Sequence, residues 1–206
     1  MIDFEKTSII YIFSKYDRNF IINLIDSIDD DDIGNNELSS FTYNIKEALK
    51  AEIGKNYESS SDYFITAYEI IKDKIPYSEK TEAKKFFENK ISKMQYNHAL
   101  SYYNDKDYSE ATELFKKYLD SEYLTYDIKK DCKYKLVWSL YYYGKDRYEN
   151  EYYYDAKDNF EEALKVLNDN WQIKNKYGSS INNLKKELGK AYWEIAKIKW
   201  SNYDIN

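Results

Sequence analysis

The side chains best suited to chemistry are few in this chain of 206 residues, and they lie far apart. His98 is the only histidine and Cys132 is the only cysteine, which excludes both an intrachain disulfide and a four-thiolate zinc site. A catalytic histidine would need a serine or cysteine nucleophile that the fold brings beside it. Because His98 falls at a helix-packing position, we interpret it as a structural histidine.

The acidic stretch that begins at Asp29 has the start of a calcium-loop pattern. Asp29, Asp31 and Gly34 match positions one, three and six of such a loop. Position five is Ile33 and position twelve is Ser40. Two oxygen ligands, including the bidentate carboxylate, are therefore missing, and we predict a solvated linker in place of a metal site.

Paired carboxylates and glycines give no catalytic pattern either. Glu161 and Glu162 are adjacent on one expected helix, whereas acid–base catalysis needs two carboxyl groups opposed across a cleft. Gly54, Gly144 and Gly189 lie within helical patterns, and a phosphate-binding loop would need glycines between a strand and a helix. The sequence predicts no enzymatic activity, no metal and no cofactor.

Charge and hydropathy indicate which partners to expect. The formal net charge of −6 disfavours nucleic-acid binding, which depends on clustered lysine and arginine. The N-terminal segment is apolar in patches, but Lys15, Asp17, Arg18 and Asp26 interrupt every stretch long enough to span a bilayer. We therefore expect a cytoplasmic protein that binds neither nucleic acid nor membrane.

The elements that carry these residues are expected to be long helices. The chain has 25 tyrosines but only five glycines and one proline, and glycine and proline are the residues that let a backbone turn sharply. Charged residues make up 33% of the chain and aromatic residues 18%. Both fractions fit helices whose apolar residues form stripes.

A period of 45 residues runs along the chain. Gly54, Ala99, Gly144 and Gly189 are separated by this step. Further columns keep the same step: Tyr63, Tyr108 and Tyr153; Thr66, Ala111 and Ala156; Ile70, Phe115 and Phe160. In each copy a small residue is followed twelve positions later by a second small residue or threonine, and four positions after that by a large apolar residue. This pattern is typical of two antiparallel helices in close contact.

Two stretches match a more specific set of positions. The first copy carries Tyr96, Asn97, Ala99, Tyr102, Asp107, Tyr108, Ala111, Phe115 and Leu119, and the second carries Gly144, Tyr153, Ala156, Phe160, Ala163 and Leu164. At these spacings the chain resembles the tetratricopeptide repeat family over 92–168, less closely over 47–74, and as half a repeat at 182–203. The resemblance implies an all-α fold, an α-solenoid of antiparallel helix pairs. The family's period is about 34 residues, so the longer step here predicts lengthened helices.

We predict an N-terminal helical segment and acidic linker over 1–38, followed by a repeat array over 39–206. The N-terminal helices are expected near 4–14 and 17–28, with a linker at 29–38; by composition, 9–13 also fits a strand. The array contains repeats near 39–76, 77–122 and 123–170 and a half repeat at 179–206. Its helix pairs are expected at 39–58 with 60–74, 78–104 with 108–121, and 126–150 with 152–168. Pro76 closes the first pair, and a last helix over 179–203 caps the array.

The tetratricopeptide resemblance also implies a binding face. In this family the first helix of each pair lines a concave surface, and fixed offsets from the small residue then give the candidate peptide- or partner-binding residues. These are Tyr96, Leu100, Tyr103, Tyr141, Lys145, Tyr148, Lys186, Lys190 and Trp193. Lysines beside aromatic rings suit an extended ligand with carboxylates and apolar side chains. The alternative interpretation is that the rings fill space between long helices and the lysines are only solvated.

The function that we predict is a non-catalytic scaffold whose concave face binds a protein or peptide, acidic and partly apolar. One alternative is a regulatory peptide receptor that changes shape when its ligand binds. Another is a self-assembling protein, a homo-oligomer in which the last helix docks onto a second copy through Trp193 and Trp200.

Overall fold

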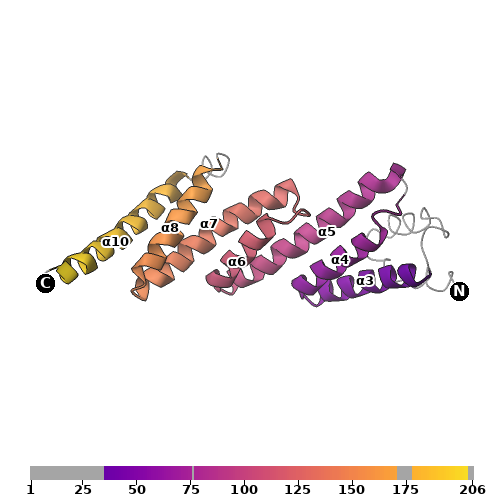
Figure 1. The fold of residues 1–206 in the computed structure, drawn as a ribbon, viewed down its shortest axis with the longest axis horizontal. Helices are drawn as coiled ribbons and strands as arrows, with labels where there is room; N and C mark the ends of the chain where they lie inside the picture. Colours follow the sequence, from indigo (N-terminus) through magenta and orange to yellow (C-terminus); the bar gives the residue numbers. More distant parts are fainter. Residues whose placement is uncertain (1–34, 76, 171–177, 204–206) are drawn as a thin grey trace. The chain divides into compact units, whose positions relative to one another are not determined.

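The computed structural model describes residues 35–75, 77–170 and 178–203, and every regular element in these ranges is an α-helix. The helices are α3 (Asn35–Ile53), α4 (Tyr57–Ile71), α5 (Tyr77–Asn104), α6 (Tyr108–Leu119), α7 (Tyr126–Glu149), α8 (Tyr153–Asn168) and α10 (Gly178–Tyr203) (Figure 1). The predicted all-α class is confirmed for this part of the chain. The predicted N-terminal helices, the strand alternative at 9–13, the stretch from Asp29 and Pro76 lie outside the described residues.

The observed helix bounds agree most closely with the prediction in the later part of the chain. From α5 onward, each observed end lies within two residues of the predicted one. Helix α3 instead begins at Asn35, so the last four residues of the predicted linker are helical. Leu38, which is 5% exposed, already packs into the core, and Glu37 lies in the first turn, where a carboxylate is favourable.

The described residues divide into two compact units: 35–98 with 122–125, and 99–121 with 126–203. In the first unit α3 and α4 form a hairpin (Figure 1), and the first part of α5 shares their core. The largest fully buried side chains of this core are Phe41, Ile45, Phe64, Ile71, Phe87, Ile91 and Met94. The segment 122–125 belongs to the same unit, since the Thr125 N–H donates to Ser92 Oγ at 3.0 Å.

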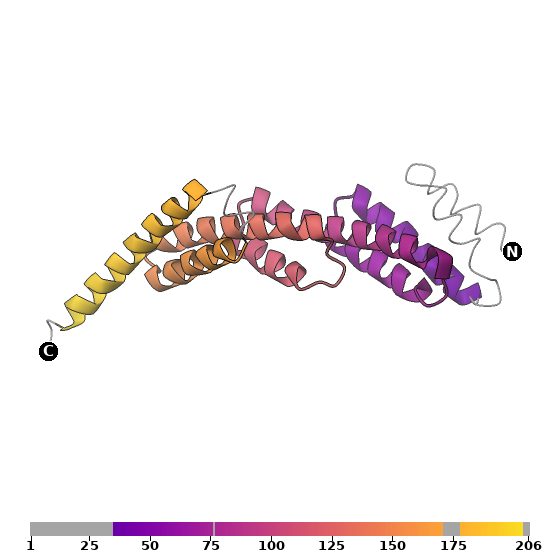
Figure 2. The same ribbon diagram turned by 90° about the horizontal axis from the view of Figure 1, so that it is seen from above.

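The second unit is built from the end of α5 and from α6, α7, α8 and α10. Helix α7 packs against both α6 and α8, and α10 lies beside α8 in both ribbon views (Figure 1, Figure 2). Its fully buried side chains include Ala111, Phe115, Leu140 and Phe160. This packing fixes the side chains that α6, α7 and α10 present to solvent.

Small residues let paired helices approach closely. Ser60 Oγ of α4 donates to the backbone oxygen of Ala48 in α3 at 2.8 Å. In the last pair, a Cβ added at Gly144 of α7 would lie only 2.7 Å from the Phe160 ring of α8. Contact this close requires a side chain of minimal size at one of the two positions.

The predicted register of the first copy is wrong by six residues. It placed Gly54 and Thr66 at the helix contact, and both are exposed. The residues buried there are Ala48, Ser60 and Phe64, the counterparts of Ala99, Ala111 and Phe115. The interval from the first copy to the second is therefore 51 residues, because α4 and α5 are longer than α6 and α7. Gly189, the last residue of the predicted column, is also exposed.

The same turn occurs after α3, α5 and α7. One residue in each turn has a positive φ: Lys55 (59°), Lys106 (64°) and Glu151 (66°). The next residue donates its N–H to the carbonyl five positions earlier: Asn56 to Ala51, Asp107 to Tyr102 and Tyr152 to Arg147. These bonds close the helix through a left-handed residue. The side chains of Asn56 and Asp107 then cap the following helix.

Gly144 and Gly189 allow a matched test of the close contact. Gly144→Ala should destabilise the chain by about 1–2 kcal/mol, because overpacking against the Phe160 ring outweighs the gain in helix propensity. Gly189→Ala should stabilise it by about 1 kcal/mol, because an added Cβ there meets nothing within 4 Å. Urea unfolding followed by circular dichroism measures both changes, and equal effects would contradict the contact.

The left-handed turn residues give a second stability test. Glu151→Gly should raise the free energy of unfolding by about 0.5–1 kcal/mol, because glycine adopts a positive φ without strain. Glu149→Gly, in the last turn of α7, should lower it by a similar amount of about 1 kcal/mol. A loss of stability in Glu151→Gly would show that the turn is formed differently in solution.

Candidate functional site

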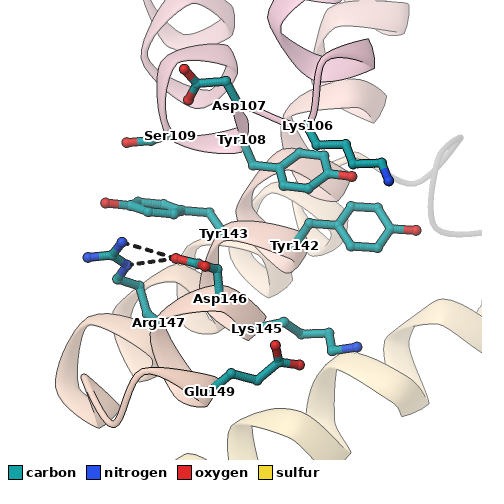
Figure 3. A pocket seen from close by; sticks show the side chains of 10 residues that line it. All are labelled: Lys106, Asp107, Tyr108, Ser109, Tyr142, Tyr143, Lys145, Asp146, Arg147 and Glu149. Carbon is teal, nitrogen blue, oxygen red and sulfur yellow. Dashed lines mark hydrogen bonds and ion pairs between the residues drawn. The ribbon is translucent and has the colours of Figure 1, made fainter.

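A pocket of about 410 Å³ lies between the start of α6 and the end of α7 in the second unit. It is lined by Lys106, Asp107, Tyr108, Ser109, Tyr142, Tyr143, Lys145, Asp146, Arg147 and Glu149 (Figure 3). One side comes from the turn before α6 and the first residues of that helix, and the other from the last turns of α7. The recurring hairpin turn therefore forms part of the wall.

Two stacked tyrosines form an aromatic part of this wall. The ring centroids of Tyr108 and Tyr142 are 4.8 Å apart, with the planes at 24°. Tyr108 is the first residue of α6, whose start is fixed by Asp107 accepting a hydrogen bond from the Glu110 N–H. Burial, and then the neighbouring Tyr142, raise the pKa of Tyr108. The phenol is thus neutral at physiological pH and offers a flat face and a hydroxyl group.

Two lysines supply positive charge to the pocket. Lys106 and Lys145 extend to the same side of the pocket as the two stacked rings (Figure 3). Among the described residues, neither lysine forms an ion pair. Arg147 differs, because its Nη2 lies 3.0 Å from Asp146 Oδ2 and its guanidinium lies 5.0 Å from the Tyr143 ring centroid. The two ammonium groups are thus the positive charges available to a ligand.

The acidic side chains of the lining restrict the positions at which the pocket can bind an anion. Asp107 is engaged in capping α6, and Asp146 holds Arg147 and also accepts from Asn150. Glu149 carries the remaining carboxylate of the lining. A ligand carboxylate is therefore favoured beside Lys106 and Lys145, and disfavoured beside Glu149.

The stacked pair belongs to a larger aromatic cluster, which we define as Tyr103, Tyr108, Trp138, Tyr141 and Tyr142. Tyr103 of α5 meets Tyr108 edge to face at 5.6 Å, and Trp138 meets Tyr141 in the same way at 5.6 Å. Lys135 Nζ lies 4.3 Å from the Tyr103 ring centroid, within the range of a cation–π interaction. The cluster links side chains of α5, α6 and α7.

A second group lies where α7 and α10 approach each other. Tyr148 packs edge to face on Tyr153 at 5.3 Å. Hydrogen bonding to Glu187 raises the pKa of Lys190, and Tyr148 and Tyr141 add to this increase. Lys190 is held by Glu187 of the same helix, with its Nζ 2.9 Å from Glu187 Oε1.

The predicted binding residues fall into these groups only in part. Tyr103, Tyr141 and Lys145 belong to the cluster or the pocket, and Tyr148 and Lys190 belong to the second group. Tyr96 lies in the first unit, and both Tyr96 and Leu100 are partly buried in α5. Lys186 is exposed, and Trp193 is 64% exposed with Lys197 Nζ 5.9 Å from its ring.

Of the ten residues that line the pocket, sequence reasoning predicted only Lys145. Lys106, Tyr108 and Tyr142 are among those it missed, as is Lys135 beside the aromatic cluster. The recurrence of tyrosine at Tyr108 and Tyr153 was visible, and both prove to be the first residues of their helices. The position of Lys106 depends on its left-handed backbone, which the residue types around it do not reveal.

The two remaining reactive side chains, Cys132 and His98, are buried or partly buried. Burial raises the pKa of the Cys132 thiol to about 12, so the thiol is protonated at neutral pH. His98 is partly buried in α5. No group of three potential metal-ligating side chains occurs in the described ranges. None of the helices described has the length and apolar character needed to cross a bilayer.

No family model, no curated protein and no solved structure matches this chain.

Replacing Tyr142 tests whether the aromatic cluster stabilises the packing of α6 on α7. Tyr142→Ala should lower the free energy of unfolding by about 2 kcal/mol, because it removes ring contacts with Tyr108, Trp138 and Tyr141. Tyr142→Phe keeps these rings in contact and should change stability by less than about 0.5 kcal/mol. Tyr154→Ala, at a position that is 50% exposed, serves as the control. Full stability of Tyr142→Ala would show that the cluster does not hold α6 against α7.

Proposed function

We propose that this chain is a non-catalytic protein- or peptide-binding scaffold of the tetratricopeptide type. Its helix pairs would stack as an α-solenoid, and the ligand would lie along α5, α7 and α10. Support comes from the recurring turn and from the recurring small-residue contact. Both are expected when one hairpin is repeated along a chain.

The observation that carries the proposal is the pocket beside Lys145. It combines two lysines that have no ion pair among the described residues with the stacked rings of Tyr108 and Tyr142. Side chains on packed helices lose little conformational freedom when a ligand binds. An acidic residue next to an aromatic or aliphatic one would satisfy both parts of the pocket.

Peptide selection tests this specificity. We expect immobilised full-length chain to select, from a library of random linear peptides, sequences in which Asp or Glu is next to an aromatic or aliphatic residue. Affinity should fall as salt is raised, because exposed charge pairs are screened. A selected peptide should bind the double variant Lys106→Ala, Lys145→Ala about tenfold more weakly.

The matched control is Lys129→Ala with Lys130→Ala. These lysines are exposed on α7 and do not line the pocket, while the change in net charge is the same. We expect this control to bind the selected peptide as the parent chain does. If both double variants lost affinity for the peptide equally, the effect would be due to net charge alone. Failure to select any peptide would refute the proposal.

A further inference from the structure

Among the described residues, helix α10 packs on its neighbours through one face. Leu184, Ala191 and Ile195 are at most 6% exposed, and their spacing places them on the side that meets α8. On the opposite side, Gly189, Trp193 and Trp200 are all exposed, the two tryptophans by 64% and 77%.

The corresponding face of α7 is occupied, and its occupant is α8. Gly144 receives the ring of Phe160, Tyr141 lies 6.1 Å from the same ring, and Tyr148 meets Tyr153. Phe160 follows Ala156 by four residues, and both are fully buried. Helix α7 thus shows what fits this face: a helix with a small residue four positions before a ring.

The outer face of α10 shares a glycine and an aromatic residue with this face of α7, at the same spacing. Moving 45 residues along the chain takes Tyr141, Gly144 and Tyr148 to Lys186, Gly189 and Trp193. A Cβ added at Gly189 would meet no atom within 4 Å. The space that Phe160 fills against α7 is therefore open against α10.

Charge distinguishes the two faces. Lys185 and Lys186 of α10 take the places of Leu140 and Tyr141 in α7. Both lysines are exposed, and neither forms an ion pair with a described residue. A helix that covers this face must therefore place acidic side chains opposite them.

We propose that the outer face of α10, defined as Lys185, Lys186, Gly189, Trp193 and Trp200, docks an acidic amphipathic helix from a partner protein. That helix carries a small residue four positions before an aromatic ring, which packs over Gly189 beside Trp193. Its carboxylates face Lys185 and Lys186. The proposal does not depend on the ligand of the pocket between α6 and α7.

The probe is a helix-constrained peptide that copies Tyr153–Asn168, the helix that fits the equivalent face of α7. This segment contains four acidic and two basic residues, which suits the two lysines. The constraint is needed because a free helix of this length is marginal in water. Titration into the full chain should give saturable binding by calorimetry and a change in tryptophan fluorescence from Trp193.

Two matched changes locate the binding. Gly189→Leu in the full chain should weaken binding about tenfold or more, because the leucine fills the space meant for the ring. Asn183→Leu adds the same side chain elsewhere on α10 and should leave binding unchanged. A peptide with Phe160→Ala should also bind about tenfold more weakly. Gly189→Leu should melt no lower than the parent, since the position is open.

Three results would overturn the proposal. The first is no binding of the constrained peptide. The second is binding that survives Gly189→Leu, which would mean that the peptide only displaces the chain's own α8. The third is a dimer of the free chain, seen by sedimentation, that Gly189→Leu dissociates, because the occupant would then be a second copy. The expected result is a monomer that binds the peptide one to one.

Discussion

The closeness of paired helices at small side chains is the constraint on which the rest of the structure depends. Ser60 of α4 reaches the backbone of α3, and Gly144 of α7 leaves no room for a methyl group beside Phe160. At such distances the large ring fills the space on either side of the small residue, so the crossing point of the two helices is fixed. Every side chain further along those helices is thereby fixed in direction.

The abundance of tyrosine follows from this arrangement. A tyrosine ring can pack against a neighbouring helix at its base while its hydroxyl stays in water. Tyr103, Tyr108 and Tyr142 are each partly exposed, and each contacts other rings. Tyr108 and Tyr142 thus pack between helices and also line the pocket, so the space-filling interpretation and the binding interpretation of the rings do not exclude each other.

Much of the fold could be predicted from the sequence, because hydrophobic spacing and helix caps act locally. The bounds of α5, α6, α7, α8 and α10 follow from these patterns. The register of the first copy could not be obtained by extending a constant step, because α4 and α5 are longer. For the site, Lys145 follows from its place in the repeat, whereas Lys106 depends on backbone geometry that only the folded turn defines.

The left-handed turns have a consequence for how this chain could evolve. Glycine would adopt the positive φ of each turn without strain, yet the residue there is lysine or glutamate, at a conformational cost of about 1 kcal/mol. A glycine has no side chain to offer, whereas the Lys106 side chain lines the pocket and supplies an ammonium group there. At this turn position, a residue that favours stability and a residue that favours ligand binding are therefore different ones. Exchanging one residue there would change the charge at a hairpin tip without disturbing the helices on either side.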